Sequence, residues 1–226
     1  YTPGHPAMLA LGVWAGRPWL VAPVLAALTV LGVYKTGRMV YGPAAGLAGA
    51  SLMMVSPWVL FMSSSFMSHP TALFFVALFF YLALKAERGG PRATALAAGA
   101  AWGMLMLARP LTAPAAGLPV AVYYGVLLAR RARLWGKALW MAVGAVLFVF
   151  LLLAYNWAFT GSPFLSPRGA YGIGFQLVRP ETFSYWLAIA EVNLAMFLMQ
   201  LFGWPMFTLA LALAARVHDP ASGRVM

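Results

Sequence analysis

Residues 39–84 read MVYGPAAGLAGASLMMVSPWVLFMSSSFMSHPTALFFVALFFYLAL and contain no Asp, Glu, Lys or Arg. A membrane-spanning helix needs about 20 apolar residues, so this stretch is too long for one crossing and suits two. Its polar cluster, SSSFMSHP at residues 63–70, predicts the break between them, and Pro70 suits the first turn of the second helix. The stretch therefore predicts two membrane helices joined by a short hairpin.

The rest of the chain has the same character. Of its 226 residues, 63% are hydrophobic and 8% are charged, whereas a soluble domain carries about 25% charged residues. Such a chain has too little polar surface for water, so we expect an all-α, polytopic transmembrane helical bundle. Read by hydropathy, it predicts seven spans, at residues 18–34, 44–61, 71–84, 93–108, 111–128, 138–158 and 200–215.

Basic residues gather in every second gap between these spans. The 15 Lys and Arg outnumber the 4 Asp and Glu, for a net charge of +11. This alternation is the positive-inside pattern of a multi-pass membrane protein, and we expect it in an inner (plasma) membrane. Anionic headgroups beside the basic loops explain the charge, so nucleic acid is not indicated. The four basic groups are Lys35 and Arg38; Lys85, Arg88 and Arg92; Arg130, Arg131, Arg133 and Lys137; and Arg216 and Arg224.

The whole chain, residues 1–226, reads as one transmembrane domain without a soluble part. Residues 160–182 form its longest extramembrane segment, on the outer side, and residues 6–15 and 183–199 suit helices on the outer surface. Because the chain starts at Tyr1 inside a predicted turn, we expect an internal piece of a longer polytopic protein. It has no cysteine, which excludes disulfides and thiolate metal sites.

Two glycine pairs predict close helix packing. Gly42 and Gly46, and likewise Gly99 and Gly103, are four residues apart and would lie on one helix face. Small residues at this spacing let helix backbones approach each other in a membrane. We interpret both pairs as packing features.

Basic residues on the predicted outer side need a reason other than topology. Arg109, His69, His5 and Arg168 lie there, and Arg and His are the side chains that hold a phosphate through charge-assisted hydrogen bonds. We therefore predict that they bind an anionic donor. A simpler alternative stays open for each: Arg109 would snorkel to the headgroups, and the two histidines would be polar residues at helix ends.

The longest outer segment holds a further group of candidates. Arg168 and Arg179 bracket GAYGIG at residues 169–174, which includes Tyr171 and suits a substrate loop folding over a ligand. Glu181 is a weak candidate for a catalytic or acceptor-orienting carboxylate, the alternative being a pair with a neighbouring Arg. No cluster of metal ligands is present in the sequence, so no metal or other cofactor is predicted.

Several short motifs together resemble the polytopic GT-C glycosyltransferases, of the type of the protein O-mannosyltransferases and the lipid A aminoarabinose transferase. The resemblance follows nearly the whole chain in the same order. The motifs are YTPGHP at residues 1–6 with LALG at 9–12, VYKTGR at 33–38 with YG at 41–42, SP at 56–57 through SHP at 68–70, LARP at 107–110, YN at 155–156 with TGSP at 160–163, and FGWP at 202–205.

This resemblance implies an enzyme of the bacterial inner membrane with its active site on the outer face. Such a transferase moves a hexose or pentose from a polyprenyl-phosphate donor to a lipid, glycan or protein acceptor, with membrane lipids around it. The family's catalytic acid lies in the first outer loop, which would precede Tyr1, and many relatives carry Asp at the position of His69. The relatives differ in whether they need a divalent metal. Two alternatives stay open: a transporter or flippase for a lipid-linked substrate, and a non-catalytic membrane scaffold.

Overall fold

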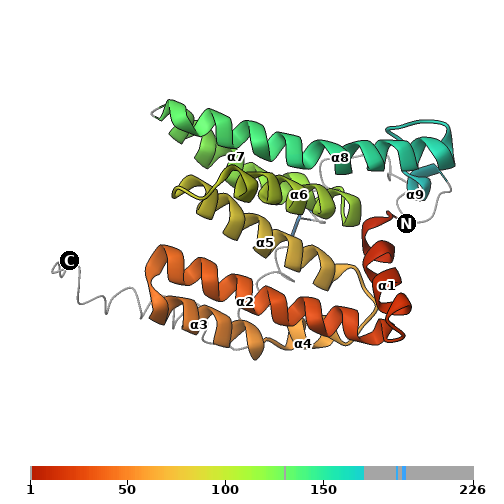
Figure 1. Ribbon diagram of the computed structural model, residues 1–226. Helices are drawn as coiled ribbons and strands as arrows, with labels where there is room; N and C mark the ends of the chain where they lie inside the picture. Colours follow the sequence, from red (N-terminus) through yellow and green to blue (C-terminus); the bar gives the residue numbers. More distant parts are fainter. Residues whose placement is uncertain (1, 130, 171–186, 188–189, 192–226) are drawn as a thin grey trace. The chain divides into compact units, whose positions relative to one another are not determined.

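The computed structural model describes residues 2–129, 131–170, 187 and 190–191, and all of its regular structure is helical (Figure 1). The chain divides into two compact units, Tyr1–Gly174 and Phe175–Met226, and the helices described below belong to the first. They are α1 Gly4–Trp14, α2 Val21–Tyr41, α3 Pro43–Met54, α4 Pro57–Ser63, α5 His69–Glu87, α6 Arg92–Ala108, α7 Thr112–Leu128, α8 Trp135–Thr160 and α9 Pro167–Ala170, with short 3₁₀ turns at Pro18–Leu20 and Ala132–Leu134. The predicted all-α class is confirmed.

Four long helices form the body of this unit. They lie side by side in the order α2, α5, α6, α8, with α3 against α2 and α7 against α5 and α6 (Figure 1). One end of this bundle carries His5, His69 and Arg109, and we call it the histidine end. The opposite end carries the described Lys and Arg side chains of the first three basic groups, and we call it the basic end; they are Lys35, Arg38, Lys85, Arg88, Arg92, Arg131 and Lys137.

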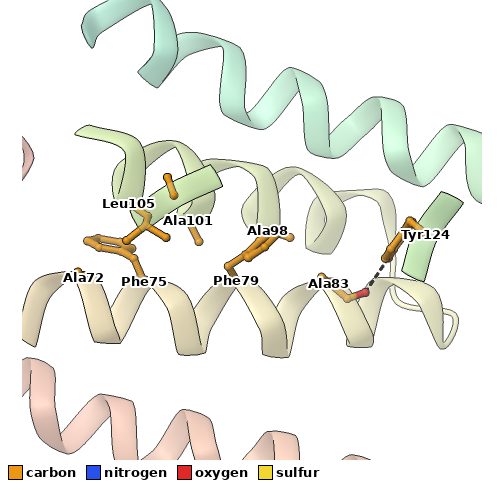
Figure 2. Packing of buried hydrophobic residues seen from close by; sticks show 9 residues of the cluster. Ala72, Phe75, Phe79, Ala83, Ala98, Ala101, Leu105 and Tyr124 are labelled. Carbon is orange, nitrogen blue, oxygen red and sulfur yellow. Dashed lines mark hydrogen bonds between the residues drawn. The ribbon is translucent and has the colours of Figure 1, made fainter. Parts of the chain in front are cut away.

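The core lies between α5, α6 and α7 (Figure 2). Phe75 and Phe79 of α5 pack against a small-residue face of α6 that includes Ala98 and Ala101. Alanines on α6 let the two helices approach closely enough for the α5 rings to fill the space between them. Tyr124 of α7 is also buried there, and its hydroxyl donates a 2.7 Å hydrogen bond to the backbone oxygen of Ala83, which satisfies a polar group inside the core.

The predicted glycine contacts are confirmed at three of four positions. Gly99 of α6 lies against the backbone oxygen of Met141 of α8, Gly103 against Phe148, and Gly46 of α3 against the backbone of α2. A Cβ atom at Gly99 would overlap the Met141 oxygen, so only glycine permits this approach. Gly42 instead has φ of 94° and forms the turn between α2 and α3.

Three helices of the described chain are long and apolar enough to cross a membrane, or four if the bent pair α3 and α4 counts as one span. The sequence-based number of seven is wrong. Helices α6 and α7 are apolar but have 17 residues each. At 1.5 Å per residue they reach about 25 Å, less than the hydrocarbon core of about 30 Å. The seventh predicted span, residues 200–215, lies outside the described residues.

The outward surface of α8 supports contact with lipid. Val143, Val146, Leu147 and Phe150 are all about half exposed or more, while Gly144 on the same helix is buried. The exposed side chains of α8 are apolar, whereas its buried side carries glycine and Asn. This distribution is typical of a helix whose outer face contacts the hydrocarbon of a membrane.

Cations at the basic end tie neighbouring helices together. Lys35 of α2 and Lys85 of α5 each place their Nζ 5.8 Å from the centroid of the Tyr81 ring. Arg131 donates a 3.1 Å hydrogen bond to the carboxylate of Glu87, which is buried at the end of α5. Glu87 is the one carboxylate of the described part of this unit, so the end remains strongly positive.

Candidate functional site

Helix α1 lies against the histidine end and closes part of it. Gly4 packs on the backbone of Leu107 and Ala108, where a Cβ atom would overlap, and the Thr2 hydroxyl donates a 2.8 Å hydrogen bond to the Ala108 oxygen. Helix α6 ends at Ala108, and Arg109 is the residue that follows it. This contact brings residues of the first turn of α1 close to the junction of α6 and α7.

His5 is buried and has both ring nitrogens engaged. Its Nε2 lies 2.8 Å from the backbone oxygen of Phe66, and its Nδ1 lies 2.8 Å from the hydroxyl of Thr71. A carbonyl oxygen only accepts, so we assign the proton to Nε2, and Nδ1 then accepts from the Thr71 hydroxyl. His5 therefore holds α1 on the hairpin before α5. A phosphate ligand would have to break one of these two bonds.

His69 is placed differently. It is the first residue of α5, its ring lies edge-on to the Trp58 ring with centroids 5.8 Å apart, and its Nδ1 is buried with no hydrogen-bond partner among the described residues. A buried nitrogen that makes no hydrogen bond costs about 1–3 kcal/mol. A ligand that hydrogen-bonds to this nitrogen would recover that cost.

Arg109 lies within electrostatic range of His69. No acidic residue pairs with Arg109 among the described residues, because the ion pair found there joins Arg131 to Glu87 at the other end of the bundle. The first turn of α5 adds backbone N–H groups at the same end, which favour a nearby anion. Arg109 and this helix terminus supply positive potential, and the unbonded nitrogen of His69 lies at the same end of the bundle.

The serines of the hairpin complete the end of α4 rather than offering free hydroxyls. The hydroxyls of Ser63, Ser64 and Ser65 donate to the backbone oxygens of Leu60, Phe61 and Met62 at 2.8 to 2.9 Å. The backbone N–H groups of Ser64 and Ser65 also donate to the Phe61 and Met62 oxygens, so the serines close the last turn of α4 with both backbone and side chain. The predicted break at residues 63–70 is thus confirmed, since α4 ends at Ser63 and α5 begins at His69.

Side-chain hydrogen bonds also cap the C-terminal end of α8, in the stretch from Asn156 to Pro163. Gly161 has φ of 71°, in the left-handed region typical of a residue after a helix end. The Asn156 amide donates to the Pro163 oxygen at 3.0 Å, and the Thr160 hydroxyl donates to the Asn156 oxygen at 2.8 Å. The motif that contributes here to the family resemblance therefore has a structural role.

Of the remaining predicted site residues, the structure describes only the backbone of Arg168, in a helix at the same end of the bundle as α1 (Figure 1). Arg168 belongs to the short helix α9, which adjoins α8, but its side chain is not among the described ones. Tyr171, Arg179 and Glu181 lie outside the described residues. In the described part of the chain, no three His, Asp or Glu residues come together in a group that would hold a metal ion.

Sequence reasoning missed two participants of this site. Thr71 and Trp58 contact the two histidines across loops and helix turns, and no local pattern in the sequence marks either residue. Comparison of the chain with protein-family models, curated proteins and solved structures finds no match. Inference about function therefore starts from this geometry and from the motifs in the chain.

Proposed function

We propose that the chain is the membrane part of a glycosyltransferase that takes a sugar from a polyprenyl-phosphate donor and passes it to a lipid, glycan or protein acceptor. The observation that supports this proposal is the buried, unbonded nitrogen of His69 at the start of α5, within electrostatic range of Arg109, which no described acid neutralises. A phosphate fits this charge, and the apolar helices around it suit the polyprenyl chain.

The proposed reaction inverts the anomeric carbon. The acceptor oxygen forms a bond to that carbon while the bond from the carbon to the phosphate oxygen breaks, and the phosphate keeps the electron pair. Arg109 and His69 would stabilise the charge that develops on the departing phosphate. His5 positions α1 at the edge of the site through Phe66 and Thr71. The base that takes the acceptor proton is not assigned to any described residue.

The basic end supplies the proposed orientation. The positive-inside pattern puts Lys35, Lys85 and Arg131 on the cytoplasmic side of a plasma membrane, and therefore the histidine end on the outer side. A lipid-linked sugar on the outer leaflet would then meet Arg109 at the membrane surface.

A binding measurement tests the phosphate site. We expect the purified protein to bind a polyprenyl phosphate at least tenfold more tightly than the matching polyprenol, by native mass spectrometry in detergent. Arg109→Gln should weaken the binding of the polyprenyl phosphate by about tenfold or more, because a hydrogen bond to a charged group contributes about 1.5–3 kcal/mol.

Arg17→Gln is the matched control, since Arg17 is an exposed arginine that precedes the turn Pro18–Leu20 and has no described role at the site. This control should bind as the unaltered protein does. Equal affinity for phosphate and alcohol, or equal losses in the two variants, would reject a phosphate site at Arg109.

One observation favours the transporter alternative. The axes of α3 and α4 differ by 60° across the two residues between Met54 and Pro57. Together the two helices are long and apolar enough to form one broken membrane span. Broken helices line the substrate sites of many transporters. Proteoliposomes separate the two functions: movement of a fluorescent polyprenyl-phosphate lipid between leaflets, without any sugar transfer, would favour transport. If the lipid moves no faster than in protein-free vesicles, the transporter function is excluded. If the protein neither binds the lipid, nor transfers a sugar, nor moves the lipid, the non-catalytic scaffold is the remaining alternative.

A further inference from the structure

A cavity of about 330 Å³ lies between α5, α6, α7 and α8. Its walls include Phe79, Trp102, Gly117, Ala121, Met141 and Ala142. It is open on one side, since Ala121 and Ala142 are exposed. Ligand sites in proteins are mostly apolar clefts of about 300–1,000 Å³, so an open apolar cavity of this size among membrane helices suits a specific apolar occupant.

Two hydrogen bonds hold α7 on either side of this cavity. The Trp102 Nε1–H donates to the Ala113 oxygen at 2.8 Å near the start of α7, and the Tyr124 hydroxyl donates to the Ala83 oxygen at 2.7 Å towards its end. Between these two bonds α7 presents Gly117 and Ala121, whose small side chains leave the space open.

The cavity wall demands an apolar occupant. Its indole and phenol donors, at Trp102 and Tyr124, are already bonded to backbone oxygens, and most of the other lining residues are Ala, Gly, Val, Met or Phe. An apolar surface whose side-chain donors are already bonded favours hydrocarbon over water or a polar ligand. Water and polar ligands are therefore disfavoured, whereas a lipid chain fits.

Charge at the nearby basic end indicates what the chain would be attached to. Tyr124 and Ala138 mark the side of the cavity next to Arg131 and Lys137. Arg131 is 51% exposed and keeps further N–H donors besides the one that bonds to Glu87. The headgroup expected beside two cations and one paired acid is an anionic one.

We propose that this cavity binds one acyl chain of an anionic membrane phospholipid whose phosphate lies beside Arg131 and Lys137. The site is separate from the histidine end and does not depend on the function proposed there. The lipid would fill the gap between α7 and α8 and hold α7 against the rest of the bundle.

Photolabelling in proteoliposomes tests this site. The probe is a phosphatidylglycerol with a diazirine halfway along one acyl chain, and labelled residues are mapped by proteolysis and mass spectrometry. We expect label on Trp102, Ala121 and Met141. Ala142→Phe, which fills the cavity, should lower this label at least fivefold, because the phenyl ring takes the place of the chain.

Ala158→Phe is the matched control, since Ala158 is an exposed alanine on the same helix that does not line the cavity; its labelling should equal that of the unaltered protein. Ala121→Leu fills the cavity from α7 and serves if Ala142→Phe does not fold. A phosphatidylcholine probe should label several-fold less, and Arg131→Gln/Lys137→Gln should abolish that preference.

Three results would overturn the proposal. The first is label confined to outward residues such as Val143 and unchanged by either cavity-filling variant. The second is equal labelling by the two headgroups, and the third is displacement of the probe by a polyprenyl phosphate but not by excess phosphatidylglycerol. An unlabelled cavity in which a cysteine at position 121 crosslinks to cysteines in residues 200–215 would show that the chain itself fills the space. The absence of native cysteines makes that crosslink unambiguous.

Discussion

Gly99→Ala is expected to cost about 3 kcal/mol of stability or more, because it separates α6 from α8. The added methyl group would overlap the backbone oxygen of Met141, and a backbone cannot turn aside as a side chain can. Overpacking a well-packed core costs about 1–3 kcal/mol, and a backbone overlap belongs at the upper end. Unfolding of the purified protein in mixed micelles by added SDS would measure the loss.

The matched control is Gly136→Ala in α8. A Cβ atom at Gly136 meets nothing within 4 Å, so the alanine should be neutral or should stabilise the helix by about 0.5–1 kcal/mol. If Gly99→Ala and Gly136→Ala unfold at the same SDS concentration, the close approach of α6 and α8 is not a determinant of stability.

Gly144 faces the same interface from the other side, since its Cβ atom would overlap the backbone oxygen of Leu96. Either substitution alone should push the two helices apart. Once they are apart, the second methyl group finds room, so Gly99→Ala/Gly144→Ala should cost clearly less than the sum of the single changes. Additive costs would mean that the two contacts are independent.

The same interface shows what a sequence can predict about this fold. Apolar stretches predict helices, and a small-residue spacing predicts that two of them touch. The spacing does not name the partner. Gly99 and Gly103 contact Met141 and Phe148 of α8, and no feature of the α6 sequence distinguishes α8 from the other apolar helices. Which helices become neighbours depends on how all of them pack together.

Helix ends show where the predicted span boundaries fail. The sequence-based spans stop at residues 34 and 84, just before Lys35 and Lys85, but α2 continues to Tyr41 and α5 to Glu87. Lys and Arg are good helix formers, so they end the apolar zone without ending the helix. The reverse holds at Pro57, where the apolar run continues and the helix breaks, because proline cannot donate the backbone hydrogen bond of a helix interior.

The candidate site, too, is only partly predictable from the sequence. The positive-inside pattern is visible in the sequence, and basic residues on the predicted outer side depart from it, which draws attention to Arg109 and His69. Their proximity comes from α5 and α6 running antiparallel, so that the start of one lies beside the end of the other. His5 shows the limit of the reasoning, since its residue type suggested a ligand and its contacts give it a structural role.

His5→Ala should release α1 from the histidine end while the rest of the bundle stays folded. The substitution leaves the Phe66 oxygen and the Thr71 hydroxyl without their bonds to the imidazole. Each buried hydrogen bond contributes about 0.5–1.5 kcal/mol, and an unpaired buried group costs more, so we expect a local loss of about 2–3 kcal/mol. Hydrogen exchange followed by mass spectrometry should then show amides of residues 4–14 exchanging about 30- to 100-fold faster.

Two threonines serve as controls for this effect, because both are fully buried and differ only in their partner. The Thr71 hydroxyl bonds to His5 across 66 residues, whereas the Thr29 hydroxyl donates to the Leu25 oxygen of its own helix at 2.7 Å. Thr71→Val should therefore accelerate exchange in α1 about tenfold, and Thr29→Val should leave it unchanged. If α1 exchanges at the same rate in all three variants, His5 does not hold it, and the neighbouring contact of Gly4 with the end of α6 must be sufficient by itself.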